Sequence, residues 1–150
     1  INNAGKLVNK PFSEISNIDL HEIYKVNVFA PFRLIRDLFP FFSSKSHTIN
    51  ISSVGGLQGS VKFQGLSAYS SSKGALTILT ECLAEEYKET KHRFNGLALG
   101  AVQTEMLEEA FPGYKATISA QEMAKFLVRF AIEDSLYYNG KVLNVSSSTP

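Results

Sequence analysis

The chain has 150 residues, of which 44% are hydrophobic, and its 15 basic side chains nearly balance its 14 acidic ones. This hydrophobic content supports a folded core and excludes a disordered chain, and the lack of any basic block argues against nucleic-acid binding. The apolar runs stay well below the roughly 20 residues that a membrane span needs, so a single domain over residues 1–150 without a membrane segment is expected.

The first half of the chain alternates helical and strand patterns. Apolar residues recur near helical spacing over residues 19–42, which predicts a long helix. Pro31 lies inside this helix and is expected to kink it. A short strand is predicted at 48–52, a loop rich in Gly and Ser at 53–67, and a second long helix at 69–90.

The second half continues this alternation. A strand is predicted at 94–99, followed by an irregular stretch at 100–118 with a short helical piece near 105–110. Residues 119–122 form a capping box, in which a Ser hydroxyl and a Glu carboxylate satisfy backbone N–H groups. The helix that this box starts leads to a last strand at 141–145. Such alternation predicts an α/β fold with a parallel sheet and helices on both faces.

The start of the second long helix contains Tyr69 and Lys73, which lie one helical turn apart. Side chains at positions i and i+4 share a helix face, so the Lys ammonium can lie beside the Tyr phenol. A neighbouring positive charge favours the phenolate and lowers the phenol pKa, which suits a proton carrier near neutral pH. We therefore expect Lys73 to lower the pKa of Tyr69.

The same Tyr-x-x-x-Lys spacing occurs at two further places, which their context distinguishes. Tyr87 and Lys91 lie in a highly charged stretch that is typical of a solvated helix end. Tyr137 and Lys141 straddle an Asn-Gly turn signal and need not share a face. Because only Tyr69 opens an apolar-periodic helix directly after a Gly- and Ser-rich loop, we take it as the candidate acid–base group.

Three segments with polar or Gly residues follow strand ends. Ser53 follows the strand at 48–52, residues 100–104 follow the next strand, and residues 2–5 follow a third strand end at the start of the chain. Ligands of open parallel sheets bind at the carboxyl ends of the strands, so these segments are expected to converge on one edge. Ser52 competes with Ser53 as the reactive hydroxyl, because alternation along the strand points the two side chains in different directions.

Several short motifs resemble, in their order along the chain, those of the short-chain dehydrogenase/reductase family. They are Asn2-Asn-Ala-Gly5, Asn27 within Tyr24-Lys-Val-Asn-Val28, Ser53 before Val-Gly, Tyr69 with Lys73, Leu97-Ala-Leu-Gly100 with Thr104, and Gly140-Lys-Val-Leu-Asn-Val145. The chain as a whole resembles the C-terminal two-thirds of such an enzyme. The resemblance implies a partial Rossmann-type, doubly wound parallel sheet. It also implies an NAD- or NADP-dependent oxidoreductase that interconverts a small-molecule alcohol and a carbonyl.

The resemblance also implies a role for each motif residue. Tyr69 would carry the proton, Lys73 would also bind the nicotinamide ribose, and Ser53 would polarise the substrate oxygen. Asn27 would bend its helix so that a backbone carbonyl leads through a water molecule to Lys73; the alternative is a polar residue that only packs the helix. The implied cofactor-binding residues are Asn3, Ala4, Gly5, Tyr69, Lys73, Gly100, Val102 and Thr104.

Some features depart from the family pattern. No strand with a Gly-rich phosphate turn precedes Asn2, so a longer polypeptide is expected and the choice between NAD and NADP cannot be inferred. Leu99 stands where the family usually has Pro. The loop between the candidate Ser and Tyr is longer than usual, and its extra residues, expected within 59–66, would reshape the substrate pocket. Residues 106–114 resemble the mobile substrate lid of the family, with an ordinary surface loop as the alternative.

A second hypothesis is a truncated, non-catalytic binding or oligomerisation module of the same fold. The apolar excess of the helices at 19–42 and 69–90, together with the resemblance, predicts a homodimer or homotetramer. Cys82 cannot form an internal disulfide, and we expect it to be a small core-facing residue of a cytoplasmic protein. The three His residues lack the spacing of metal ligands, so no metal site is expected.

Overall fold

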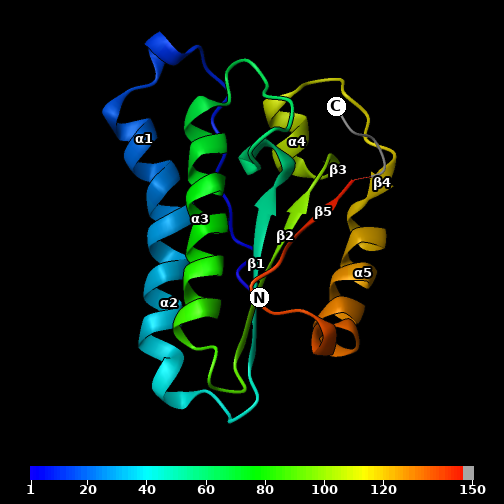
Figure 1. The fold of residues 1–150 in the computed structure, drawn as a ribbon. Helices are drawn as coiled ribbons and strands as arrows, with labels where there is room; N and C mark the ends of the chain where they lie inside the picture. Colours follow the sequence, from blue (N-terminus) through cyan, green and yellow to red (C-terminus); the bar gives the residue numbers. More distant parts are fainter. Residues whose placement is uncertain (147–150) are drawn as a thin grey trace.

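The computed structural model describes residues 1–146, and three parallel strands form its main sheet. They are β1 (His47–Ser53), β2 (Arg93–Leu99) and β5 (Val142–Val145), in the order β1-β2-β5. Asn2 lies beside β1 through a parallel bridge to Asn50. Helices α1, α2 and α3 lie on one side of the sheet and α5 lies on the other (Figure 1). The predicted parallel α/β fold with helices on both faces is therefore confirmed.

A wide turn divides the helix predicted at 19–42. The segment consists of α1 (Asn17–Tyr24), the π-helical turn η2 (Lys25–Phe29), α2 (Ala30–Leu38) and the 3-10 turn η3 (Phe39–Phe41), and the 3-10 turn η1 (Phe12–Glu14) precedes it. The irregularity is centred on Asn27, so the prediction of a kink at Pro31 is wrong in position. Pro31 lies in the first turn of α2. It has no N–H to donate to the carbonyl four residues earlier, and a widened turn before it accommodates that loss.

The second long helix, α3 (Ser67–Glu86), begins two residues earlier and ends four residues earlier than predicted. After it the chain turns, with the amide of Thr90 donating to the carbonyl of Tyr87 at 2.9 Å. The buried positions of α3 lie on one face, at residues 68, 72, 73, 76, 77, 80 and 84. Cys82 falls outside that face and is exposed, so the expectation of a core-facing cysteine is wrong.

The remaining elements agree with most of the predictions. They are β3 (Val102–Gln103), α4 (Glu105–Ala110), β4 (Ile118–Ser119), α5 (Ala120–Ile132) and η5 (Asp134–Tyr137). The short helix α4 and the capping box of Ser119 and Glu122 at the start of α5 are confirmed. The parallel pair of β3 and β4 is not predicted, because two-residue strands carry no readable alternation.

Two cores stabilise the two faces of the sheet. On one face, Ile49, Ile51 and Leu97 pack with Phe130 of α5. On the other face, Phe94 packs with Ile35 of α2 and Ala84 of α3. The alternation of β1 turns Asn50 and Ser52 toward α3. Asn50 Nδ2 donates to Thr80 Oγ1 at 2.9 Å, and Ser52 Oγ donates to the carbonyl of Lys73 at 3.0 Å.

Candidate active site

The loop that follows β1 brings Ser53 to the first turns of α3. Ser53 ends β1 and caps the 3-10 turn η4 (Val54–Gly56), where its hydroxyl accepts from the amide of Gly55 at 3.3 Å. Gly56 lies directly on the helix backbone, since a Cβ at this position would be 2.7 Å from the carbonyl carbon of Lys73. Only a residue without a side chain permits this approach, and it holds Ser53 close to Tyr69.

Tyr69, Ser53 and Lys73 form one cluster. The hydroxyl of Ser53 lies beside that of Tyr69 and favours the phenolate, but burial outweighs this effect and raises the pKa of Tyr69. The ammonium of Lys73 lies 5.8 Å from the centroid of the Tyr69 ring. It donates to the carbonyl of Ile51 at 2.8 Å. The prediction that Lys73 lowers the pKa of Tyr69 is therefore wrong for this structure.

The pKa of the Lys73 ammonium is also shifted, because this group is buried beneath the site. The side chain is only 3% exposed, and this burial lowers the pKa of Lys73 to about 8. Desolvation disfavours the charged form of an amine, and the Ile51 carbonyl supplies one compensating acceptor. Lys73 is thus the only charged side chain among the buried residues in the described part of the chain.

The structure separates the two candidate hydroxyls on β1. Ser52 is buried against α3, where its hydroxyl contacts the Lys73 carbonyl and lies 3.2 Å from Thr77 Oγ1. Ser53 faces the other way and meets Tyr69. The geometry therefore brings Ser53 into the site and gives Ser52 a role in attaching α3 to the sheet.

Asn27 connects the wide turn η2 to two other segments. It is fully buried. Its Oδ1 accepts from the amide of Lys6 at 2.8 Å, while its Nδ2 donates to the Lys6 carbonyl and to Ser72 Oγ, both at 2.9 Å. The sequence gives no hint of Ser72, which is one of three consecutive Ser residues. Asn27 lies in the middle of the wide turn, and its bonds to Lys6 and Ser72 fix the start of the chain beside α3.

The predicted cofactor-binding residues divide into two groups. Gly5 belongs to the cluster, because a Cβ there would be 3.6 Å from Lys73 Nζ and 3.8 Å from Asn27 Oδ1. Asn3 and Ala4 precede it and are exposed. In the second group, Gly100 packs against Ser146 near the end of β5, where a Cβ would be 2.6 Å from Ser146 Oγ.

The remaining two predicted residues lead into α4. Val102 lies in β3, and Thr104 caps α4 by accepting from the amide of Leu107 at 3.3 Å. Next in the chain, Met106 extends toward the cluster, and its Cε would lie 3.5 Å from a Cβ at Gly5. This part of the chain therefore covers the space beside Lys73.

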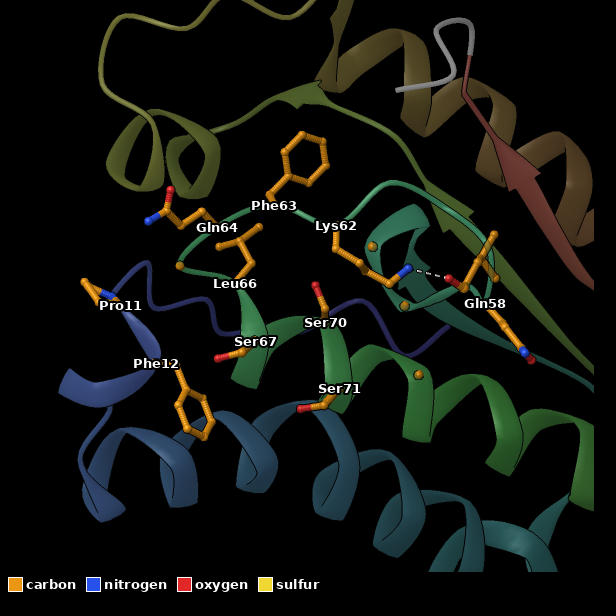
Figure 2. Close-up of a pocket in the computed structure, with 15 residues that line it drawn as sticks. Pro11, Phe12, Gln58, Lys62, Phe63, Gln64, Leu66, Ser67, Ser70 and Ser71 are labelled. Atoms are coloured by element: carbon orange, nitrogen blue, oxygen red, sulfur yellow. Dashed lines mark hydrogen bonds between the residues drawn. The ribbon is translucent and has the colours of Figure 1, made fainter.

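A groove of about 750 Å³ lies beside the start of α3, between the loop 57–66 and the segment that contains Pro11 and Phe12 (Figure 2). Lys62 donates to the carbonyl of Leu57 at 2.6 Å and braces this loop. Ser70 Oγ is buried at the groove without a hydrogen-bond partner among the described residues. Tyr69 is not one of the lining residues, so the long loop shapes a groove next to the cluster.

Two features of residues 1–146 limit the kinds of site that this part of the chain can form. No group of three or more His, Cys, Asp or Glu side chains is placed to hold a metal ion there. None of the helices in that range combines the length and the hydropathy required to cross a membrane.

Comparisons with known proteins add independent information on this arrangement. A sequence profile described as short chain dehydrogenase matches residues 1–115. L-2,3-butanediol dehydrogenase of Corynebacterium glutamicum is 36% identical over 169 residues, which cover 97% of this chain and 64% of that enzyme. The 3-oxoacyl-[acyl-carrier-protein] reductase FabG of Aquifex aeolicus is 30% identical over 158 residues, covering 97% of this chain and 62% of the relative. The chain thus spans just under two-thirds of the length of these relatives.

A solved structure agrees with the sequence comparison. A short chain dehydrogenase from Escherichia coli CFT073, complexed with NADPH, superposes with a TM-score of 0.84 at 28% sequence identity. The match covers 95% of this chain and 60% of that structure. The described sheet and its helices therefore correspond to the larger part of a complete enzyme of this kind.

Proposed function

The chain belongs to the short-chain dehydrogenase family, and from this premise we propose that the protein interconverts an alcohol and a carbonyl with NAD or NADP. The observation that carries the proposal is the cluster in which the Ser53 hydroxyl lies beside that of Tyr69 while the Lys73 ammonium lies near the Tyr69 ring. The hydroxyls of Ser53 and Tyr69 and the ammonium of Lys73 can each donate a hydrogen bond to the oxygen of a small substrate. The relatives named above support the reaction class.

Tyr69 is proposed to exchange the proton and Ser53 to hold the reacting oxygen. The bound nicotinamide supplies or accepts the hydride. Because burial raises the pKa of Tyr69, the phenol is protonated at neutral pH and is ready to donate to a carbonyl oxygen during reduction. Alcohol oxidation requires the phenolate instead, so its rate should rise with pH.

The residues around Gly5 fit a nicotinamide cofactor. An ammonium has three N–H donors, and the Ile51 carbonyl takes one of those of Lys73. Gly5 lies next to Lys73, since a Cβ at Gly5 would be 3.6 Å from Lys73 Nζ. Asn3, Ala4 and Gly5 would hold one side of the cofactor, and Gly100, Val102 and Thr104 would hold the other.

The test measures reduction of NAD or NADP by absorbance with a panel of small alcohols that includes 2,3-butanediol, the substrate in the name of one relative. Tyr69→Phe should lower turnover by about 10²–10⁴-fold, the usual contribution of a positioned proton carrier. Tyr137→Phe is the matched control, since Tyr137 has the same spacing to a Lys but is 81% exposed. Undiminished turnover in Tyr69→Phe would reject the assignment. No turnover by the wild-type protein with any alcohol or carbonyl would favour the non-catalytic module.

A homodimer or homotetramer and a cytoplasmic location are also proposed. Phe32 and Leu34 of α2 and Ile78 of α3 are each at least half exposed, at 50%, 51% and 58%. Association would remove such apolar side chains from water. Light scattering at micromolar concentration should give a mass above that of the monomer, and Ile78→Asp should lower it. A monomeric wild-type protein would refute the association.

A further inference from the structure

Three segments beside the site meet at Asn9. Its Nδ2 donates to the carbonyl of Ala110, the last residue of α4, at 2.8 Å. The neighbouring amide of Lys10 donates to the carbonyl of Gly65 at 3.1 Å. Figure 1 places α4 and the loop that follows β1 at the same end of the sheet, beyond the tips of the strands. The segment 5–10 therefore joins α4 to the loop 57–66.

Gly65 receives the side chain of Asn9 in close contact. A Cβ at Gly65 would lie 1.9 Å from Asn9 Oδ1, and its φ of +83° is in the region that favours glycine. Gly59 in the same loop has a similar φ of +78° but no atom within 4 Å of the position of its Cβ. Gly65 must therefore be glycine both for its backbone conformation and for the close contact with Asn9. Gly59 has the same backbone conformation but no such contact.

The segment from Thr104 to Lys115, here called the cover, is attached to the site at two points. Met106 Cε lies near Gly5 and thereby close to Lys73. The other point is the hydrogen bond between Asn9 and Ala110. Just outside the two ends of the cover, the side chain of Gln103 accepts from the amide of Ala116 at 2.9 Å, so the two ends are held together. Opening of the cover must therefore break the Asn9 contact.

We propose that Asn9 is a positioning residue that latches the cover over the site and couples it to the loop 57–66. That this cover closes over a nicotinamide and a substrate rests on the proposed function. One exposed hydrogen bond between neutral groups changes an equilibrium by about threefold to tenfold. Loss of the latch should raise the population of the open cover by this factor without changing the fold of the sheet.

Trypsin cleavage after Lys115 measures opening without cofactor or substrate. Cleavage at a transiently opened site follows the population of the open form. Asn9→Asp keeps the side-chain size but replaces the amide donor with an acceptor that faces the Ala110 carbonyl. Gly65→Ala displaces the Asn9 side chain, while Gly59→Ala introduces similar backbone strain away from Asn9. Cleavage after Lys115 is quantified by mass spectrometry under native conditions, alongside the melting temperature.

Asn9→Asp and Gly65→Ala should each accelerate cleavage after Lys115 by about threefold to tenfold, and the double variant should be no faster than the faster single variant. Gly59→Ala should leave that cleavage unchanged. Equal acceleration by Gly59→Ala and Gly65→Ala would attribute the effect to loop strain, and no acceleration in Asn9→Asp would reject the latch.

Kinetics then separate the latch from the chemistry. In an active protein, Asn9→Asp should raise the KM of the cofactor and leave kcat within about twofold, because the latch acts on binding equilibria and not on the reacting atoms. A fall in kcat with KM unchanged would overturn the positioning role. If the wild-type protein shows no turnover, the proposed function fails, but the cleavage assay still decides whether the latch exists.

Discussion

The two faces of the sheet are built differently. The face toward α5 is built mainly from apolar side chains, with Ile49, Ile51 and Leu97 against Phe130, and a buried Asn95 bonds to His47 near the start of β1. The face of β1 toward α3 is polar: Asn50 and Ser52 of the strand bond to Thr80 and to the backbone of α3. Apolar packing is non-directional, whereas hydrogen bonds fix distance and angle. Both faces carry an apolar core that supplies stability, but on the α3 face the hydrogen bonds from β1 also set the position of the helix that carries Tyr69 and Lys73.

Phe130→Ala should reveal the stabilising role of the α5 face. Phe130 is 2% exposed, and its ring lies 5.8 Å from those of His47 and Tyr138. Truncation of a buried Phe costs about 3–5 kcal/mol, which urea unfolding would measure. Val128→Ala on the same helix is the control, because Val128 is 54% exposed and surface changes stay within about 0.5 kcal/mol. Loss of turnover beyond the lost folded fraction would contradict the division of roles.

Lys73→Met tests the burial of the Lys73 ammonium on the α3 face through the pH dependence of the free energy of unfolding. The pKa of Lys73 is lowered to about 8 from its ordinary value of 10.5, so the unfolded state binds more protons between those two pH values. Stability then rises with pH across this window. Relative to Lys73→Met, the wild-type free energy of unfolding should increase by about 3 kcal/mol from pH 8 to pH 10.5. Parallel curves for the two proteins would show that the ammonium is not desolvated in the fold.

Asn27→Ala tests whether the wide turn η2 keeps Gly5 and Lys6 in place beside α3. The change removes the partner of the Lys6 amide and carbonyl, and buried groups left unpaired cost about 1–3 kcal/mol. Thermal unfolding should show this loss, and cofactor affinity should fall because Gly5 is no longer fixed beside Lys73. Asn17→Ala, at an exposed position of α1, is the matched control. A variant with unchanged stability and unchanged cofactor affinity would show that Asn27 does not help to position the site.

These two faces also show what sequence can predict. Apolar spacing locates α5, and helical spacing places Tyr69 and Lys73 on one face of α3. The pKa of Tyr69 is not predicted correctly, because its burial depends on the packed structure and not on its spacing to Lys73. The helix break is predicted one turn too late, because the hydrogen bond that Pro31 cannot donate is missing at the carbonyl of Asn27, four residues earlier.

Features that depend on nearby residues can be predicted from the sequence, whereas features that depend on packing cannot. The capping box of Ser119 and Glu122 is readable because its partners are three residues apart. The exposed position of Cys82 is not predicted, because a rotation of α3 about its axis by a single residue changes which side chains face the sheet. The choice between Ser52 and Ser53 depends on what each face of β1 meets, which only the packed structure supplies.

The most direct test of the account compares Ser53→Ala with Ser52→Ala, two adjacent deletions of a single hydroxyl. Turnover and melting temperature are measured on both proteins in parallel. Ser53→Ala should lose about 10²-fold or more in turnover, as on removal of one hydrogen-bond donor to a reacting oxygen, and should keep its melting temperature. Ser52→Ala should lose about 1 kcal/mol of stability and keep its turnover. The opposite pattern, with turnover lost only in Ser52→Ala, would contradict the proposed site.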